Sequence, residues 1–162
     1  MANVETADVN MAHLFPSFRD KVVLILAQVN YETKGKLPGI AGWKVAEGFR
    51  SQARQDWLYA QGRTRPGSIV TYKRGATGNH PKGLAVDIYP HDANGNIIWE
   101  PDGRCWQWLG HAARTNKMQW GGDYQKLFGG SFIDQPHVEP PTPLRLLWTI
   151  PALAYLRKIG LR

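Results

Sequence analysis

The sequence predicts a single, loop-rich α+β domain. The chain has 162 residues, which allows one sizeable hydrophobic core and leaves little room for a second independent domain. Apolar residues make up 43% of the chain and charged residues 20%, which is typical of a globular protein and excludes a disordered or fibrous one. Stretches with helical or strand-like spacing alternate with turns that hold many of the 17 glycines and 11 prolines, which indicates short elements joined by irregular connections.

Residues 1–16 are polar and lack a periodic pattern, so we expect a loosely ordered lead-in. From Ser17 onward, apolar residues recur at the spacing of one helix face. Ser17 and Asp20 have the spacing of a capping box, so we expect the helix to begin at Ser17 and to end near Gly35. The apolar face of this predicted helix consists of Phe18, Val22, Ile25 and Val29.

A strand, a second helix and a long loop are predicted next. Residues 43–49 alternate between apolar and polar side chains well enough to form a strand. Ser51 is a favoured N-cap for a helix over residues 52–61, which Gly62 would end. Residues 62–83 hold five glycines and are predicted to form a long ordered loop. Loops of this length inside a compact domain are usually functional.

Short strands and one more helix are predicted in the second half of the chain. Asn94-Gly95 favours a tight hairpin turn between the predicted strands at residues 84–89 and 97–99. We expect Pro90 to end the strand at residues 84–89 and Pro140 to end the strand at residues 137–139. The predicted strands cover residues 84–89, 97–99, 118–120 and 137–139, and the predicted helix covers residues 104–116.

We therefore place the main domain at residues 17–141, followed by a basic and apolar tail at residues 142–162. The tail is expected to form a helix that is interrupted at Pro151. Either it packs against the domain, or its apolar and basic side chains lie on an anionic membrane surface. Its longest uncharged apolar stretch, the eleven residues 146–156, is shorter than the roughly 20 residues that a membrane-spanning helix needs.

Composition narrows the range of partners. Lys and Arg outnumber Asp and Glu by 20 to 13, and the resulting charge of +7 favours anionic partners. No run of four basic residues occurs, so we do not expect binding to nucleic acid. Cys105 is the only cysteine, which excludes an intrachain disulfide and a cysteine-based zinc cluster. Glu5 and Asp8 precede the first basic residue, unlike in a signal peptide, so we expect a soluble monomer made in the cytosol.

Two of the five histidines lie where a metal site could form. The contexts of His13, His91 and His111 favour ordinary surface or core roles. His80, in contrast, begins a segment that contains a proline and a glycine and ends on an aspartate. His137 lies in a predicted strand that follows a glycine-rich loop.

A chain that folds back at Gly83 would bring the His80 imidazole and the Asp87 carboxylate around one ion. This reversal is a strict condition, because zinc requires ligand atoms about 2.0–2.2 Å away. His137 could supply a third ligand from a second strand. Two histidines and one carboxylate, with a fourth position left to water, have the composition of a catalytic zinc site. The spacing alone leaves open that these are ordinary surface or core residues.

Two further residues could take part in the chemistry. Asp134 lies three residues before His137, where a carboxylate can exchange protons with a water and a leaving group. The alternative role for Asp134 is that of a turn residue before a proline. Arg50 precedes a predicted helix N-terminus, where its planar donors could hold a substrate carboxylate or carbonyl, and the alternative is a surface salt bridge.

Five segments, in order along the chain, resemble one group of enzymes. They are Gly48-Phe49-Arg50-Ser51, residues 58–71, residues 80–87, Trp120-Gly121-Gly122-Asp123-Tyr124 and residues 134–139. Together they resemble the zinc peptidases of the D-alanyl-D-alanine carboxypeptidase clan, over residues 17–140. The members most similar to this sequence are the L-alanyl-D-glutamate endopeptidases that bacteriophages use as endolysins.

This resemblance implies a small antiparallel sheet that carries the zinc site and is flanked by helices, the fold shared with hedgehog-like domains. Members often have Ser two residues before the first zinc-binding histidine, whereas this chain has Gly78 there and lacks that hydroxyl contact to substrate. The residues implied are His80, Asp87 and His137 for binding Zn²⁺ and Asp134 as general base and acid. The resemblance also implies that Arg50 steadies the substrate or the developing oxyanion, and that Trp120 and Asp123 shape the wall near the site.

The function implied by the resemblance is that of a zinc metallopeptidase that cuts the peptidoglycan stem peptide, between L-Ala and D-Glu, for cell-wall lysis. One alternative is a D,D-carboxypeptidase of the same clan, and another is a non-catalytic zinc-containing domain that binds the cell wall. The stem peptide carries several carboxylates, which suits the positive charge of this chain. An endolysin would remain in the cytoplasm of the host bacterium until release and would then act in the periplasm or cell wall.

Overall fold

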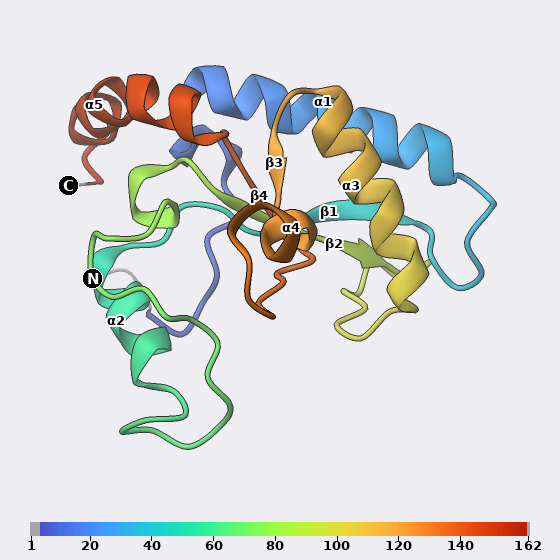
Figure 1. Ribbon diagram of the computed structural model, residues 1–162, viewed down its shortest axis with the longest axis horizontal. Coiled ribbons are helices and arrows are strands. Elements are labelled where there is room, and N and C mark those ends of the chain that lie inside the picture. The colour runs from blue at the N-terminus through green and yellow to red at the C-terminus, as the bar shows by residue number, and fades with distance from the viewer. Residues whose placement is uncertain (1–3, 162) are drawn as a thin grey trace.

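The computed structural model describes residues 4–161, which form an α+β fold around a four-stranded antiparallel sheet (Figure 1). The strand order is β1-β2-β4-β3, and each neighbouring pair is antiparallel. The strands are β1 (Gly42–Glu47), β2 (Val86–His91), β3 (Gln119–Trp120) and β4 (His137–Glu139). The fold class expected from the sequence is confirmed.

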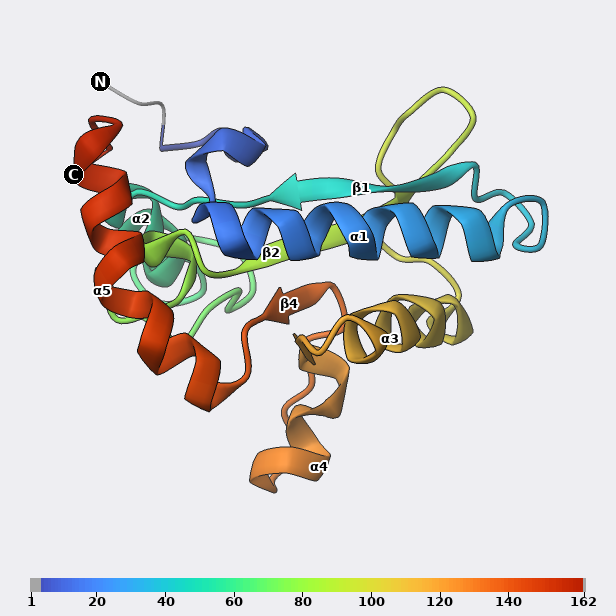
Figure 2. The ribbon, with the colours of Figure 1, turned by 90° about the horizontal axis from the view of Figure 1, so that it is seen from above.

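Helices lie on both sides of this sheet. Figures 1 and 2 show α1 running across one face of the strands with α3 beside it, while α2 lies on the other side. Short 3₁₀ turns connect several of these elements. The helices are α1 (Pro16–Thr33), α2 (Gln52–Ala60), α3 (Trp106–Thr115), α4 (Tyr124–Phe128) and α5 (Thr142–Lys158).

The hydrophobic core lies between α1, α3 and one face of the sheet. The helix face predicted for α1 is confirmed, because its four apolar residues are completely buried. Burying four such side chains provides much of the driving force that holds α1 on the sheet, at about 1.5–3 kcal/mol each. The strands and α3 contribute Val86, Ile88, Val138, Leu109 and Ala112 to the same core.

The alternation of side chains along β2 and β4 separates the core from the polar face of the sheet. Ile88 and Val138 point into the core, whereas Asp87 and His137 line a cavity on the opposite face. This follows from the two-residue period of a strand. The hydrophobic residues of the core therefore determine which side of the sheet receives the polar ones.

The loop over residues 62–83 and the helix that Ser51 begins are confirmed. The Ser51 hydroxyl accepts a hydrogen bond from the Arg54 backbone N–H, 3.1 Å away, as an N-cap does. The capping box at Ser17 is wrong, because α1 begins one residue earlier, at Pro16, without a side-chain cap. Proline is favoured in the first turn of a helix, because a backbone N–H there would have no partner within the helix and its absence costs nothing.

Two predictions about β2 and its hairpin are wrong. Pro90 lies inside β2, opposite Trp43 of β1, rather than closing the strand. The short strand β4 pairs only with the first two residues of β2, so at Pro90 no β4 backbone requires the missing N–H. The return strand over residues 97–99 is reduced to one bridge between His91 and Ile97. The short helix α4 was not predicted.

Both ends of the described chain pack against the rest. The Asp8 carbonyl accepts a hydrogen bond from the Gly48 N–H, 2.7 Å away. At the other end, α5 continues through Pro151, buries Ala152 and Leu156, and donates from the Tyr155 hydroxyl to the Ala12 carbonyl. Among the described residues, none of the helices has the length and apolar character needed to cross a bilayer.

We expect Gly110→Ala to destabilise the fold. A Cβ at this buried position of α3 would lie 2.5 Å from the Trp120 ring, so the packing must shift. Overpacking of this kind costs about 1–3 kcal/mol, which exceeds the gain of up to about 1 kcal/mol from the helix propensity of alanine. Urea unfolding followed by circular dichroism would measure the loss. Gly103→Ala is the control, because no atom lies within 4 Å of its Cβ, and equal stability of the two variants would contradict this packing.

Candidate metal centre

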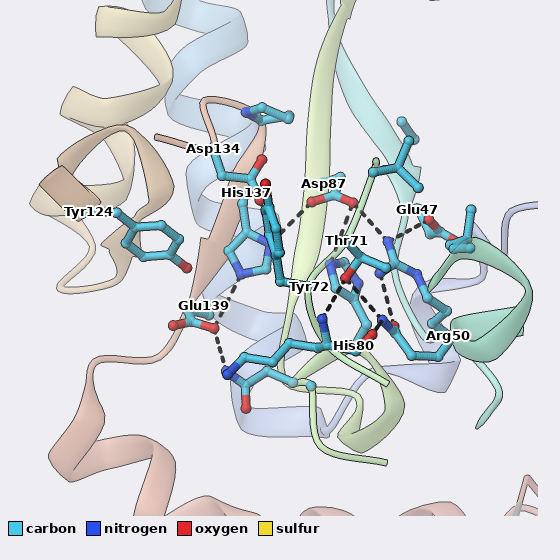
Figure 3. Close-up of a pocket in the computed structure, with 18 of the residues that line it drawn as sticks. Glu47, Arg50, Thr71, Tyr72, His80, Asp87, Tyr124, Asp134, His137 and Glu139 are labelled. Carbon is cyan, nitrogen blue, oxygen red and sulfur yellow. Dashed lines mark hydrogen bonds and ion pairs between the residues drawn. The ribbon is translucent and has the colours of Figure 1, made fainter. Parts of the chain in front are cut away.

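A cavity of about 810 Å³ opens on the face of the sheet opposite α1 (Figure 3). Its floor is formed by β2 and β4, and the long loop before His80 contributes a wall. Aromatic rings pack on one another at its edge: Tyr124 stacks on Phe132, and Tyr72 meets Phe132 edge-on. A cavity with convergent polar groups and an aromatic wall is the usual form of a small-ligand or active site.

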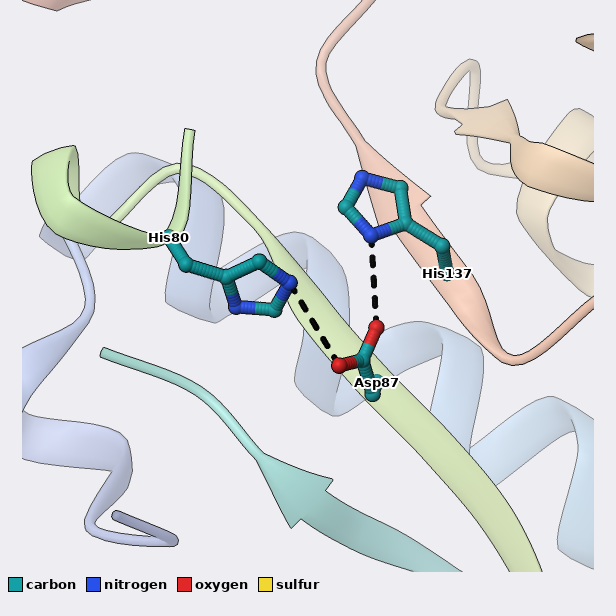
Figure 4. A group of neighbouring side chains, drawn as sticks. All are labelled: His80, Asp87 and His137. Atoms are coloured by element: carbon teal, nitrogen blue, oxygen red, sulfur yellow. Dashed lines mark hydrogen bonds and ion pairs between the residues drawn. The ribbon is translucent and has the colours of Figure 1, made fainter. Parts of the chain in front are cut away.

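His80, Asp87 and His137 meet in this cavity, as Figure 4 shows. Asp87 and His137 are direct partners in the register of β2 with β4, and His137 Nδ1 lies 3.2 Å from Asp87 Oδ1. The other carboxylate oxygen, Oδ2, lies 3.5 Å from His80 Nε2. Two residues from neighbouring strands and one from a loop therefore present their donor atoms to a common point.

The chain reverses at Gly83, as the sequence predicted, and this brings His80 to Asp87. Gly83 follows a 3₁₀ turn and adopts a left-handed conformation with φ of +66°, which glycine tolerates without strain. His80 Nδ1 donates a hydrogen bond to the Gly48 carbonyl, 2.7 Å away. Because a carbonyl only accepts, this contact fixes the proton on Nδ1 and leaves Nε2 as the free donor atom of His80.

The ring of His137 is held in a similar way from its far side. Its Nε2 lies 3.2 Å from Glu139 Oε2 and donates to that carboxylate, while Nδ1 faces Asp87. Glu139 lies on the same face of β4 as His137 because the two residues are two positions apart in the strand. A histidine whose second nitrogen donates to a carboxylate is the common arrangement of a metal ligand.

The donor set fits a tetrahedral metal ion such as zinc. One ligand atom from each of His80, Asp87 and His137 lies within 4.8 Å of the others. Ligands at about 2.0–2.2 Å from zinc are separated by roughly 3.3–3.6 Å. The distances of 3.2 Å from His137 Nδ1 to Asp87 Oδ1 and of 3.5 Å from His80 Nε2 to Asp87 Oδ2 are close to that spacing, each measured to a different carboxylate oxygen. Within the described residues, these three form the single such group of His, Cys, Asp and Glu side chains.

The charges of the site favour a cation. Burial alone would raise the pKa of Asp87, but the two histidines together hold it well below 3.8. Burial alone would lower the pKa of His137, yet its hydrogen bonds to Asp87 and Glu139 raise that pKa to about 10. The carboxylates that stabilise a proton on His137 would equally stabilise a divalent cation beside it.

Arg50 lies beside the cluster, in a network that the sequence did not reveal. Its Nη2 donates to Glu47 at 2.7 Å and to Asp87 Oδ2 at 3.3 Å, and its Nη1 donates to Gln55 at 3.1 Å. Arg54 donates to the other oxygen of Glu47. Glu47 is also the β1 partner of Asp87 in the sheet register, so Arg50 joins two neighbouring carboxylates. The planar fork of arginine suits such a bridging position.

Asp134 lines the same cavity, and its Oδ2 lies 4.0 Å from His137 Nδ1. Its carboxyl remains 37% exposed, which leaves it open to a substrate. Burial raises the pKa of Asp134, against the lowering effect of His137. Gly121 is required here, because a Cβ would lie 2.2 Å from the Asp134 carbonyl oxygen.

Trp120 and Asp123 are not brought to this cavity. Trp120 is buried and donates from Nε1 to the Gln135 carbonyl, 2.6 Å away, while Asp123 pairs with Arg114 at 2.9 Å. Both line a separate hollow beside α3 and α4. Gly78 does line the main cavity, and a Cβ there would meet atoms no closer than 3.5 Å, so a serine would fit.

The remaining histidines have ordinary partners, as expected. His13 pairs with Asp8 at 2.6 Å, the His91 ring donates to the Asp92 carbonyl, and His111 faces Glu32 at 3.7 Å. The functional neighbours that the sequence analysis missed are Glu47 and Glu139. For Glu139 a signal was present, because residues two apart in a strand share a face.

Comparison of the sequence with known proteins finds a matching family model and a similar curated protein. The model of the family described as D-alanyl-D-alanine carboxypeptidase matches residues 72–140, which include the three clustered residues. The peptidoglycan L-alanyl-D-glutamate endopeptidase CwlK of Bacillus subtilis (strain 168) is 43% identical over 102 residues, which cover 59% of this chain and 58% of CwlK. The chain thus spans less than two thirds of the length of this curated relative.

Solved structures share the fold. The L-Ala D-Glu endopeptidase ChiX of Serratia marcescens matches with a TM-score of 0.55 at 24% identity, over 83% of this chain and 85% of ChiX. DacB of Streptococcus pneumoniae D39 matches with a TM-score of 0.55 at 19% identity, over 100% of this chain and 86% of DacB. The model of the D-alanyl-D-alanine carboxypeptidase family therefore matches a part of this chain, residues 72–140, and the solved structures show that the chain shares their fold.

Proposed function

We propose that this chain is a zinc-dependent peptidoglycan hydrolase that cuts the stem peptide between L-Ala and D-Glu. The observation that carries the proposal is the cluster of His80, Asp87 and His137 in an open cavity, within the residues 72–140 that the family model matches. The CwlK of Bacillus subtilis is an L-alanyl-D-glutamate endopeptidase by name, and its 43% identity supports the same bond preference here.

Zinc is the metal that this donor set suits best. Two imidazoles and one carboxylate, with no thiolate, are characteristic of catalytic zinc sites that keep one position open. A bound zinc ion would supply a Lewis acid for the scissile carbonyl and for the attacking water. His80 and His137 would offer Nε2 and Nδ1, respectively, because their other nitrogens already donate to Gly48 and Glu139.

Asp134 is the proposed general base and acid. Its carboxyl lies at the cavity beside His137, where it can accept a proton from the attacking water. The water oxygen bonds to the carbonyl carbon of L-Ala, the bond to the D-Glu nitrogen breaks, and Asp134 returns the proton to the departing amine. Water is thereby added across one amide bond, and a carboxylate and an amine result.

Arg50 and the basic residues of the cavity suit an acidic substrate. Arg50 is held by Glu47 and Gln55 at the cavity wall, which keeps its guanidinium beside Asp87 of the metal cluster. There it would steady the substrate or the negative charge that develops on the carbonyl oxygen. Lys73, Lys82 and Arg145 also line the cavity, and the stem peptide carries several carboxylates.

We expect His80→Ala to remove both the metal and the activity. Losing one of three ligands should abolish stoichiometric zinc binding, and cleavage of purified peptidoglycan should fall by at least about a hundredfold. Metal analysis and mass spectrometry of the digest would measure the two quantities. His111→Ala is the matched control, because His111 lies outside the cluster, on α3.

The digest also separates the competing functions. Stem peptides cut between L-Ala and D-Glu would support the proposal. Release of D-Ala alone would indicate a D,D-carboxypeptidase instead. A wild-type protein that holds zinc and leaves peptidoglycan intact would indicate a cell-wall-binding domain and would overturn the proposed enzyme.

Asp134→Asn should separate catalysis from metal binding. The amide has the shape of the carboxyl but cannot take up the proton, so we expect a loss of about 10²–10⁴ in kcat with the zinc content unchanged. Asp20→Asn, at an exposed position of α1, controls for the loss of one negative charge. Full activity of Asp134→Asn would contradict its role as the base.

We propose, in addition, that α5 contacts an anionic lipid surface during lysis by an endolysin. Leu146, Leu147 and Ile150 form a row on α5, each at least 70% exposed, while Ala152 and Leu156 face the domain. The helix carries no acidic residue and ends on Arg157 and Lys158. An apolar face with cations and no anions complements anionic lipid headgroups.

Vesicle flotation tests the lipid contact. We expect the protein to float with phosphatidylglycerol vesicles and to stay behind with phosphatidylcholine vesicles. Replacing Leu146, Leu147 and Ile150 by serine should weaken vesicle binding by at least about tenfold. Serines at Val23 and Leu24 of α1, each 52% exposed, provide the control. Dimerisation through this face without vesicle binding would overturn the lipid assignment.

A further inference from the structure

The carboxylate of Glu139 connects the candidate metal site to the C-terminal helix. Glu139 is only 5% exposed, and both of its oxygens are occupied. Oε2 accepts from His137 Nε2 at 3.2 Å and from Asn79 Nδ2. Oε1 accepts from Arg145 Nη1 at 2.6 Å and from Gln119 Nε2 at 3.2 Å. Each hydrogen bond restricts the carboxylate, so its position relative to the His137 ring is fixed from several sides.

The orientation of His137 depends on this carboxylate. Only Nδ1 of the ring faces Asp87, so the ring can share an ion with Asp87 and His80 in this one orientation. When a metal ion takes Nδ1, the remaining proton of the ring must lie on Nε2, where the Glu139 carboxylate accepts it. A ring without that acceptor could rotate or place its proton on Nδ1, and either change would remove the donor atom from the cluster.

Arg145 belongs to α5, outside the region matched by the family model. Its Nη1 pairs with Glu139, and its Nη2 donates to the Thr142 hydroxyl at 3.1 Å. The helix is attached to the domain by buried Ala152 and Leu156. The docking of α5 therefore determines where the guanidinium lies, and the guanidinium contributes to where Glu139 lies.

We propose that Arg145 and Glu139 are positioning residues for the metal site, and that α5 is part of that site rather than a separable tail. The proposal rests on the metal site described above. The chain of contacts runs from α5 through Arg145 and Glu139 to His137, and each link is a direct hydrogen bond. Metal affinity should consequently depend on a residue of α5 that does not itself bind the metal.

Whether replacing Arg145 weakens or strengthens zinc binding distinguishes a positioning role from a simple effect of its charge. Removing the positive charge of Arg145 would by itself make the site more negative and strengthen the binding of a cation. Removing an orienting contact weakens binding instead, because the ligand must be ordered when the metal binds. Partners that orient a metal-binding histidine typically contribute 10–100-fold in affinity.

The test measures zinc affinity of the full chain by competition with a chromophoric chelator. We expect Glu139→Gln to weaken zinc binding by about 10–100-fold and Arg145→Ala by roughly tenfold, the lower end of that range. Arg145→Lys should recover part of the loss, because its ammonium can still donate to Glu139. Arg157→Ala, at an exposed position of the same helix, should bind zinc as the wild type does.

A second readout follows the geometry of the site. The d–d absorption bands of the cobalt-loaded protein should change in Arg145→Ala and remain unchanged in Arg157→Ala. Unchanged or tighter zinc binding in Arg145→Ala, with unchanged cobalt bands, would overturn the inference. If the wild type itself binds no zinc, the proposed function fails. If the wild type binds zinc and cleaves peptidoglycan, while Glu139→Gln and Arg145→Ala bind zinc as tightly as the wild type, only the positioning role fails.

Discussion

The antiparallel register between β2 and β4 is the constraint on which the rest of the structure depends. It sets Asp87 directly opposite His137, and the pairing of β1 with β2 sets Glu47 opposite Asp87. Three polar residues thus form a row across the sheet. A slip of one residue would turn this row into the core and expose Val138, so the burial of apolar side chains on the α1 face enforces the register of the polar face.

The three clustered side chains, His80, Asp87 and His137, can present their ligand atoms to one ion because each has a second partner that holds it in place. His80 donates to a backbone carbonyl, His137 donates to Glu139, and Asp87 accepts from Arg50. Burying several carboxylates together is costly unless cations and hydrogen bonds compensate. Arg50, in the loop before α2, compensates Asp87, and Arg145 of α5 compensates Glu139. Distant parts of the chain therefore stabilise one site.

Local patterns in the sequence predicted the elements whose formation depends on local rules. The apolar spacing of α1, the N-cap at Ser51 and the reversal at Gly83 follow from periodicity and backbone freedom, and all three are confirmed. Spacing made His80, Asp87, His137 and Asp134 candidates, and the resemblance selected them over the ordinary roles that the spacing left open. Contacts between distant segments could not be predicted in this way. Arg145 and Glu139 meet only because α5 packs back on the domain, and Trp120 turns away from the cavity because Gly110 leaves room for its ring.

The central claim is that His80, Asp87 and His137 hold one zinc ion together. X-ray absorption at the zinc edge of the stoichiometrically loaded protein tests this most directly. We expect nitrogen and oxygen ligands at about 2.0–2.2 Å, scattering from two imidazoles, and no sulfur. A variant that lacks His137 should lose one imidazole from that spectrum. Zinc bound with sulfur, or with the same imidazole scattering after His137 is removed, would contradict the account.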